Sequence, residues 1–175
     1  RTPEGFRLAR ELALRKYSDI HDALSREYPD RMGLALEAED VETILQSGKK
    51  AAIIGMENGY PIGEDLSAIR LFYQQGCRYI TLCHNGHNQI CDSQQNAGGP
   101  PEEHGGLSPF GKEVVAEMNR LGIIIDVSHL SKKSMLDVVR LSRAPVIASH
   151  AACRALCDVP RNLDDEQLLA LKANG

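Results

Sequence analysis

Four residues with chemically versatile side chains stand close behind apolar stretches of the sequence: Glu57, His84, His129 and His150. If these stretches are parallel strands, the four side chains gather at the carboxyl ends of the strands, where α/β folds place their active sites. Imidazole nitrogens and a carboxylate are typical zinc ligands, and a carboxylate can bridge two ions. One such residue alone is more often structural, but the repetition behind four successive stretches favours a metal site.

The spacing of apolar residues predicts the elements that position these side chains. Four apolar runs are typical of buried strands, at residues 50–55, 78–83, 123–127 and 144–148. Amphipathic helices are predicted over much of the first 30 residues and over residues 39–46, 65–75, 109–121, 131–141 and from 164 onward. Helix start signals support the last three, because they begin at Ser108-Pro109, at Ser131 and at Asp164, which has Gln167 three residues on.

The alternation of strands and helices predicts an α/β fold with parallel strands covered by helices. We expect residues 1–48 to form a helical lead-in and residues 49–175 to hold four strand–helix units. A complete (β/α)8 barrel of the TIM type needs about 250 residues. We therefore expect the 175 residues to be a central arc of one barrel domain, with the first and last strands outside this chain. An open doubly wound sheet is the structural alternative.

Composition and motifs argue against several other classes. A net charge of −4 does not favour a nucleic-acid partner, which would need a clustered basic face. No P-loop, GxGxxG or GxSxG motif is present. Glu57 and Asp126 could serve glycoside hydrolysis, but the strand-end histidines would then have no role. Five cysteines without a CxxC pair argue against a cysteine-ligated zinc, and no apolar run approaches the ~20 residues of a membrane span.

Several short segments together resemble the membrane (renal) dipeptidase family of metallopeptidases. They stand in that family's order and at its spacings, over a region from about Glu37 to the end of the chain. The resemblance implies a (β/α)8 barrel with two zinc ions at its carboxyl-terminal mouth. The segments are Gly55–Gly59, Thr81–Asn85, Gly106–Gly111, Asp126–His129, Ser149–His150 and Pro160–Asn162.

The resemblance also implies a role for each residue of the site. Glu57 would bridge both zinc ions and stay ionised between them, and His129 and His150 would complete the ligands of one ion. His84 would lie beside the metals, contact the substrate and stabilise the tetrahedral intermediate. Arg161 would hold the free carboxylate of a dipeptide. A metal-bridging hydroxide would attack the peptide carbonyl, its pKa lowered by the cations.

Two further residues are expected to support the ligands from behind. Asp126 precedes His129 by three residues and is expected to orient a neighbouring side chain or backbone group. Asn85, next to His84, is placed in the same supporting class. The family's first metal also needs a His-x-Asp pair on its first strand, and a substrate-side aspartate on a later strand assists proton transfer; neither has a counterpart here. We therefore expect this chain to hold the ligands of one metal only and to be part of a longer protein.

Zinc-dependent hydrolysis of dipeptides is the function that the resemblance implies. The alternatives are a metal-dependent amide hydrolase or tailoring enzyme of secondary metabolism on the same barrel, and a catalytically inactive barrel that serves as a binding module. Members of this family are often exported, membrane-anchored and dimeric. We accordingly expect a homodimer, and export to the periplasm or a membrane surface rather than a cytoplasmic location, with any membrane anchor outside this chain.

Overall fold

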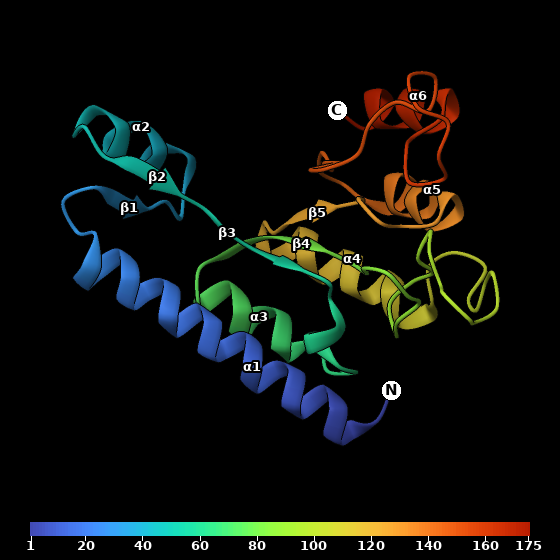
Figure 1. The fold of residues 1–175 in the computed structure, drawn as a ribbon, viewed down its shortest axis with the longest axis horizontal. Helices are drawn as coiled ribbons and strands as arrows, with labels where there is room; N and C mark the ends of the chain where they lie inside the picture. The colour runs from blue at the N-terminus through green and yellow to red at the C-terminus, as the bar shows by residue number, and fades with distance from the viewer.

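The computed structural model describes residues 1–175 and contains a parallel three-stranded sheet at its centre (Figure 1). The strands are β3 (Ile54–Glu57), β4 (Cys77–Thr81) and β5 (Ile124–Asp126), in the order β3-β4-β5. The helices α3 (Ser67–Gln74) and α4 (Pro109–Leu121) connect them, and α5 (Lys132–Leu141) and α6 (Asp165–Asn174) follow. The predicted α/β class with parallel strands is therefore confirmed.

The register of the sheet separates a core face from a polar face. Met56, Ile80 and Ile125 lie side by side across the three strands and are buried. They belong to the main apolar core, with Ile69 and Phe72 of α3 and Met118 of α4 among its other members. Because side chains alternate along a strand, their sequence neighbours Glu57, Thr81 and Asp126 form a second row on the opposite face. Two residues predicted for the site, Glu57 and Asp126, therefore lie in one row, with Thr81 between them.

The amino-terminal part differs from the predicted helical lead-in. Helix α1 (Pro3–Asp22) is continued by a π-helical turn (Ala23–Glu27), and α2 (Ala38–Gln46) is present as predicted. Between them lies an unpredicted strand, β1 (Met32–Leu34), which pairs in parallel with β2 (Lys50–Ala52). The single strand predicted over residues 50–55 is thus wrong, because its first half pairs with β1 and its second half, as β3, joins the central sheet. Figure 1 shows this two-stranded unit standing apart from that sheet.

The fourth predicted strand, residues 144–148, is also not a regular strand. Only Ile147 pairs with the sheet: its N–H donates to Ile125 O at 3.0 Å, and its carbonyl accepts from Val127 N at 2.8 Å. Pro145 has no N–H to donate, and the N–H of Val146 is taken by Asn174 Oδ1 of α6 at 2.8 Å. The segment therefore runs beside β5 with a single point of attachment.

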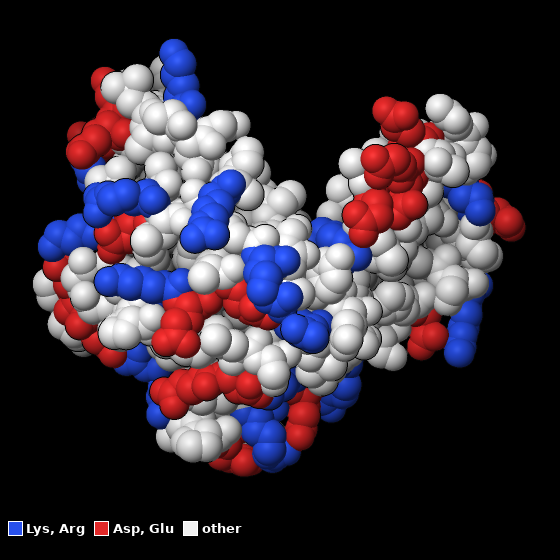
Figure 2. Space-filling model, turned by 180° about the vertical axis from the view of Figure 1, so that it is seen from behind, with Lys and Arg blue, Asp and Glu red and all other residues white.

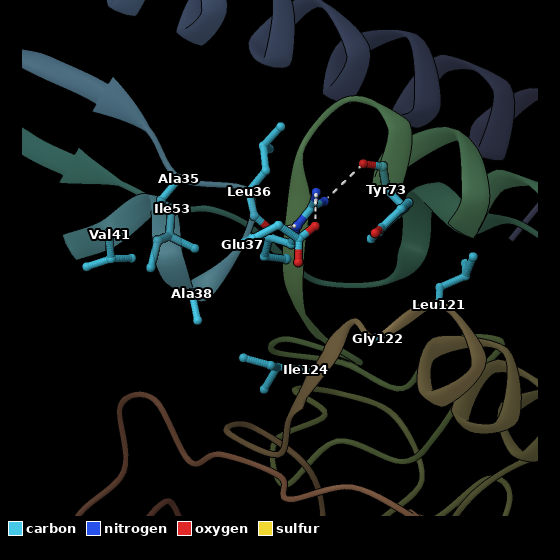
Figure 3. Close-up of a pocket in the computed structure, with 11 residues that line it drawn as sticks. Ala35, Leu36, Glu37, Ala38, Val41, Ile53, Tyr73, Leu121, Gly122 and Ile124 are labelled. Atoms are coloured by element: carbon cyan, nitrogen blue, oxygen red, sulfur yellow. Dashed lines mark hydrogen bonds and ion pairs between the residues drawn. The ribbon is translucent and has the colours of Figure 1, made fainter. Parts of the chain in front are cut away.

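An apolar pocket of about 310 Å³ opens at the amino ends of the strands (Figure 3). Ile53, just before β3, and Ile124, the first residue of β5, are among the residues that line it. Arg78 also lines the pocket, with Nε donating to Leu36 O at 2.6 Å and its guanidinium 4.2 Å from the ring centre of Tyr73. This pocket lies at the opposite end of the sheet from Glu57 and is not the candidate functional site.

On the face in Figure 2, basic and acidic side chains are interspersed, and the outline is notched between two lobes. No helix in the structure combines the length and the apolar character needed to cross a membrane.

Candidate metal centre

The sheet and three loops bring the four predicted residues together. Glu57 is the last residue of β3, and His84 and His129 follow β4 and β5 by three residues each. His129 has a φ of 70°, so the chain turns sharply at this residue. His150 comes three residues after Ile147, the one residue of its segment that pairs with β5. The position of each side chain is therefore set by a different strand or segment of the same sheet.

The side-chain atoms of these residues converge on one carboxylate oxygen. Oε1 of Glu57 lies 3.1 Å from Nε2 of His129 and 3.1 Å from Nε2 of His150. The two Nε2 atoms are 2.8 Å apart. Nε2 of His84 is 3.6 Å from the same oxygen, and its ring centre lies 4.2 Å from that of His129. The structure therefore brings the four predicted residues together in one place.

The convergence fits a bound cation. Three acceptor atoms so close together repel one another unless a proton or a metal ion lies between them. On a tetrahedral zinc ion with bonds near 2.0–2.1 Å, neighbouring ligand atoms stand roughly 3.3 Å apart. The separations of 2.8 and 3.1 Å among Glu57, His129 and His150 are close to that spacing. The donor set of two imidazoles and a carboxylate is also one that zinc prefers.

A second triad shares two of these residues. Ligand atoms of Glu57, His84 and His129 also lie within 4.8 Å of one another. The distances favour His150 over His84 as the third ligand, because His84 Nε2 is 3.6 Å from the glutamate oxygen whereas His150 Nε2 is 3.1 Å from it. His84 therefore lies at the side of the triad, with its side chain partly exposed.

The electrostatics keep His129 available as a ligand. Burial lowers the pKa of His129 to about 4, and the nearby positive charge of Arg161 acts in the same direction. The imidazole is therefore neutral near pH 7, the state in which a ring nitrogen binds a metal ion.

Asp126, for which the sequence predicts a place behind the ligands, is the last residue of β5. Its carboxylate is fully buried and accepts from Thr81 Oγ1 at 2.6 Å, Ser128 N at 3.0 Å, and Ser149 N and Oγ at 3.0 and 2.6 Å. Burial alone would raise the pKa of Asp126, but these hydrogen bonds outweigh burial and hold that pKa below its ordinary value. Asn85, the other predicted supporting residue, is exposed and makes no hydrogen bond to the site.

Arg161 lies beside the triad without a partner. Its guanidinium forms no hydrogen bond or ion pair with the chain, although the residue is only partly exposed. Burial lowers the pKa of Arg161 from its ordinary value. Together with His129 and Gln94, Arg161 lines a mainly polar pocket of about 220 Å³, in which Gln94 Oε1 is buried and also lacks a partner. The guanidinium is suited to a negatively charged group of a ligand, whereas Gln94 Oε1 can only accept and is suited to an N–H or O–H group.

One buried carboxylate, that of Asp92, fixes several backbone groups of the loop of residues 84–107. Asp92 is fully buried and accepts hydrogen bonds from the backbone N–H groups of Glu103 at 2.9 Å, His104 at 3.1 Å and Gly106 at 3.1 Å. Burial alone would raise the pKa of Asp92, but the three N–H groups outweigh it and lower that pKa below the ordinary 3.8. The ionised carboxylate is therefore the form that orders the loop.

We predict that Asp92→Asn lowers the free energy of unfolding by about 2 kcal/mol at pH 7, since hydrogen bonds to a charged acceptor are lost. The stabilising effect of a carboxylate with a lowered pKa is full above the unfolded-state pKa and is lost as the pH falls through the folded-state pKa. The difference between wild type and variant should therefore shrink below about pH 4. Denaturant unfolding at several pH values tests this. Asp158→Asn, at a side chain that is 90% exposed, is the control and should change little.

The cysteines contribute no disulfide to this region. All five are free thiols in the structure, and Cys77, Cys83 and Cys91 are buried, as expected for small core side chains.

The chain matches the family model of the membrane dipeptidases (peptidase family M19) over residues 3–175. The dipeptidase verJ of Clonostachys rogersoniana is 43% identical over 157 residues, which are 90% of this chain and 40% of that protein. The dipeptidase tcpJ of Claviceps purpurea is 42% identical over 156 residues, covering 89% of this chain and 36% of that protein. This chain thus spans about 40% of the length of such relatives.

Two solved structures resemble this one closely. The probable dipeptidase PvdM from Pseudomonas aeruginosa superposes with a TM-score of 0.87 at 38% identity, over 90% of this chain and 40% of that one. A metallopeptidase from Rhodobacter sphaeroides, liganded with a phosphinate mimic of the dipeptide L-Ala-D-Ala, gives a TM-score of 0.81 at 32% identity, over 93% and 46% of the two chains. These findings confirm the resemblance that the sequence motifs indicated. The chain belongs to the membrane dipeptidase family, peptidase family M19.

Proposed function

We propose that the full-length protein hydrolyses the peptide bond of dipeptides with zinc bound at the centre formed by Glu57, His129 and His150. The observation that carries this proposal is the convergence of two imidazole nitrogens on Glu57 Oε1, each at 3.1 Å. When bound, zinc would polarise the scissile carbonyl and lower the pKa of the attacking water. Membership of the dipeptidase family supports a peptide bond as the target.

The chain's own residues would bind and orient the substrate. The unpartnered guanidinium of Arg161 would hold the free carboxylate of the dipeptide, because its planar fork matches a carboxylate. This would place the peptide bond next to the metal ligands. The partly exposed ring of His84, 3.6 Å from Glu57, would donate a hydrogen bond to the oxygen on which charge develops. The related metallopeptidase with a bound dipeptide mimic supports a substrate of this size.

The proposal extends to parts of the protein that this chain does not contain. We propose two zinc ions, with Glu57 bridging them and the remaining ligands coming from other segments of a (β/α)8 barrel. Residues 1–175 would be one part of that single barrel domain. Export and dimerisation remain predictions.

A panel of substrates tests the proposed function. The full-length protein with zinc should hydrolyse dipeptides, including some with a D-residue at the carboxyl end. N-Acetyl amino acids, which retain the amide bond and the carboxylate but lack the free amino end, are the comparison. If only these were cleaved, the protein would be a different metal-dependent amide hydrolase. If zinc bound and no amide were cleaved, the inactive-barrel alternative would hold.

A further inference from the structure

The buried carboxylate of Asp126 and the metal-side histidine His150 are joined by a hydroxyl group. Oδ2 of Asp126 and Nδ1 of His150 are 4.0 Å apart, too far for a direct hydrogen bond. Oγ of Ser149 lies between them, 2.6 Å from the carboxylate oxygen and 2.7 Å from Nδ1. The three groups therefore form a short chain of hydrogen bonds behind His150.

The number of available protons fixes the donor and the acceptor in each of these two hydrogen bonds. An ionised carboxylate can only accept, so the single hydroxyl proton of Ser149 is donated to Asp126. The oxygen of Ser149 is then left as an acceptor, and Nδ1 of His150 must carry the proton that it receives. In a neutral imidazole the other nitrogen, Nε2, is then unprotonated. This is the nitrogen that lies 3.1 Å from Glu57 Oε1.

We infer that Ser149 is a positioning residue of the metal centre: its hydroxyl relays the charge of Asp126 to Nδ1 of His150 and so holds Nε2 unprotonated and directed at the cation. This inference rests on the proposed zinc site and adds a residue to which neither the sequence motifs nor the family comparison assigns a role. Metal-ligating histidines usually donate their second N–H directly to a carboxylate or carbonyl group. Here a serine takes that place.

The backbone explains why His150 needs this support. Its segment is attached to the sheet only through Ile147, so no regular strand fixes the residues that follow. Side chains hold them instead: Asp126 Oδ1 accepts from Ser149 N at 3.0 Å, and Ser128 Oγ accepts from His150 N at 3.1 Å. The ring of His150 is also 45% exposed, whereas that of His129 is 10% exposed and packed. Packing therefore cannot orient His150 as it orients His129.

Zinc affinity measured by chelator competition tests the inference on the full-length protein. Ser149→Ala should weaken zinc binding by about 10–100-fold, the usual effect of removing a partner behind a ligand. Ser149→Thr keeps the hydroxyl and should stay within about threefold of wild type. Thr81→Val is the matched control, because it removes the other hydroxyl on Asp126 Oδ2 but leaves the relay intact. It should also stay within about threefold.

The ring nitrogens of His150 provide a readout that does not need zinc. In the zinc-free wild type at about pH 8, where imidazoles are neutral, ¹⁵N NMR should find Nδ1 protonated and Nε2 unprotonated. In Ser149→Ala this preference should be lost. Unchanged zinc affinity and an unchanged tautomer in Ser149→Ala would overturn the inference.

Two further outcomes are decided by the same data. If Ser149→Ala does not fold, the wild-type spectrum decides, and a proton on Nε2 would contradict the relay. If the wild type binds no zinc, the proposed function fails, while the tautomer of His150 still tests the relay separately.

Discussion

Replacing Glu57 by Gln is expected to abolish zinc binding at this centre and to lower kcat by at least three orders of magnitude. Its Oε1 is the atom on which all three histidine Nε2 atoms converge, at 3.1, 3.1 and 3.6 Å. An amide carries no charge to neutralise a cation and cannot bridge two. Since a bound cation supplies several kcal/mol to the transition state, a loss of about 4 kcal/mol corresponds to this factor.

The fold of Glu57→Gln should be preserved, because the side chain is 50% exposed and the two residues are nearly equal in volume. Its free energy of unfolding without zinc should stay within about 0.5 kcal/mol of wild type. Glu64→Gln, an exposed glutamate with no hydrogen bond in the structure, is the matched control and should keep full activity. Near-normal turnover by Glu57→Gln would show that the carboxylate is not the central ligand.

Arg161→Ala is expected to discriminate between two forms of the same substrate. For dipeptides with a free carboxylate, kcat/KM should fall by about 100-fold, since charge-assisted hydrogen bonds worth about 3 kcal/mol are lost. For the same dipeptides with an amidated carboxyl end, the change should be only a few-fold, because those substrates form no ion pair in the wild type. Steady-state kinetics on both substrate series measures the difference.

Two further variants make the Arg161 experiment specific. Arg161→Lys keeps the positive charge but loses the planar pair of donors, so its activity should lie between those of wild type and Arg161→Ala. Arg143→Ala removes an arginine that is exposed and away from the metal ligands, and should leave both substrate series unchanged. Equal losses on free and amidated substrates in Arg161→Ala would assign the guanidinium to the structure of the site rather than to carboxylate binding.

The elements that the sequence predicted correctly are those determined by neighbouring residues. The helix starts at Ser108, Ser131 and Asp164 are confirmed, because each cap binds a backbone N–H three residues ahead. Strand pairing depends on residues distant in the sequence, and the outcome there is mixed. The runs 78–83 and 123–127 form the parallel strands β4 and β5, but the strands predicted at 50–55 and 144–148 were wrong. Residues 50–55 form one continuous apolar run. No neighbouring residue indicates that the first half of this run pairs with β1 rather than with the central sheet.

The four residues of the site were predictable because one rule places them. Side chains at the carboxyl ends of parallel strands meet at one edge, and Glu57 and the three histidines follow that rule. Ser149 could not be recognised, because hydroxyl residues are common and its role depends on a distance of 2.6 Å to Asp126 that only the fold sets. For Asn85, proximity to His84 in the sequence suggested a supporting role, and its exposed side chain makes no such contact.

Anomalous diffraction at the zinc edge, on crystals of the full-length protein grown with zinc, tests the central claim most directly. We expect a peak within about 2.3 Å of Glu57 Oε1 and of Nε2 in both His129 and His150. A second peak should lie on the other side of the same carboxylate. A map with no peak at Glu57, or with zinc bound only elsewhere in the protein, would contradict the account.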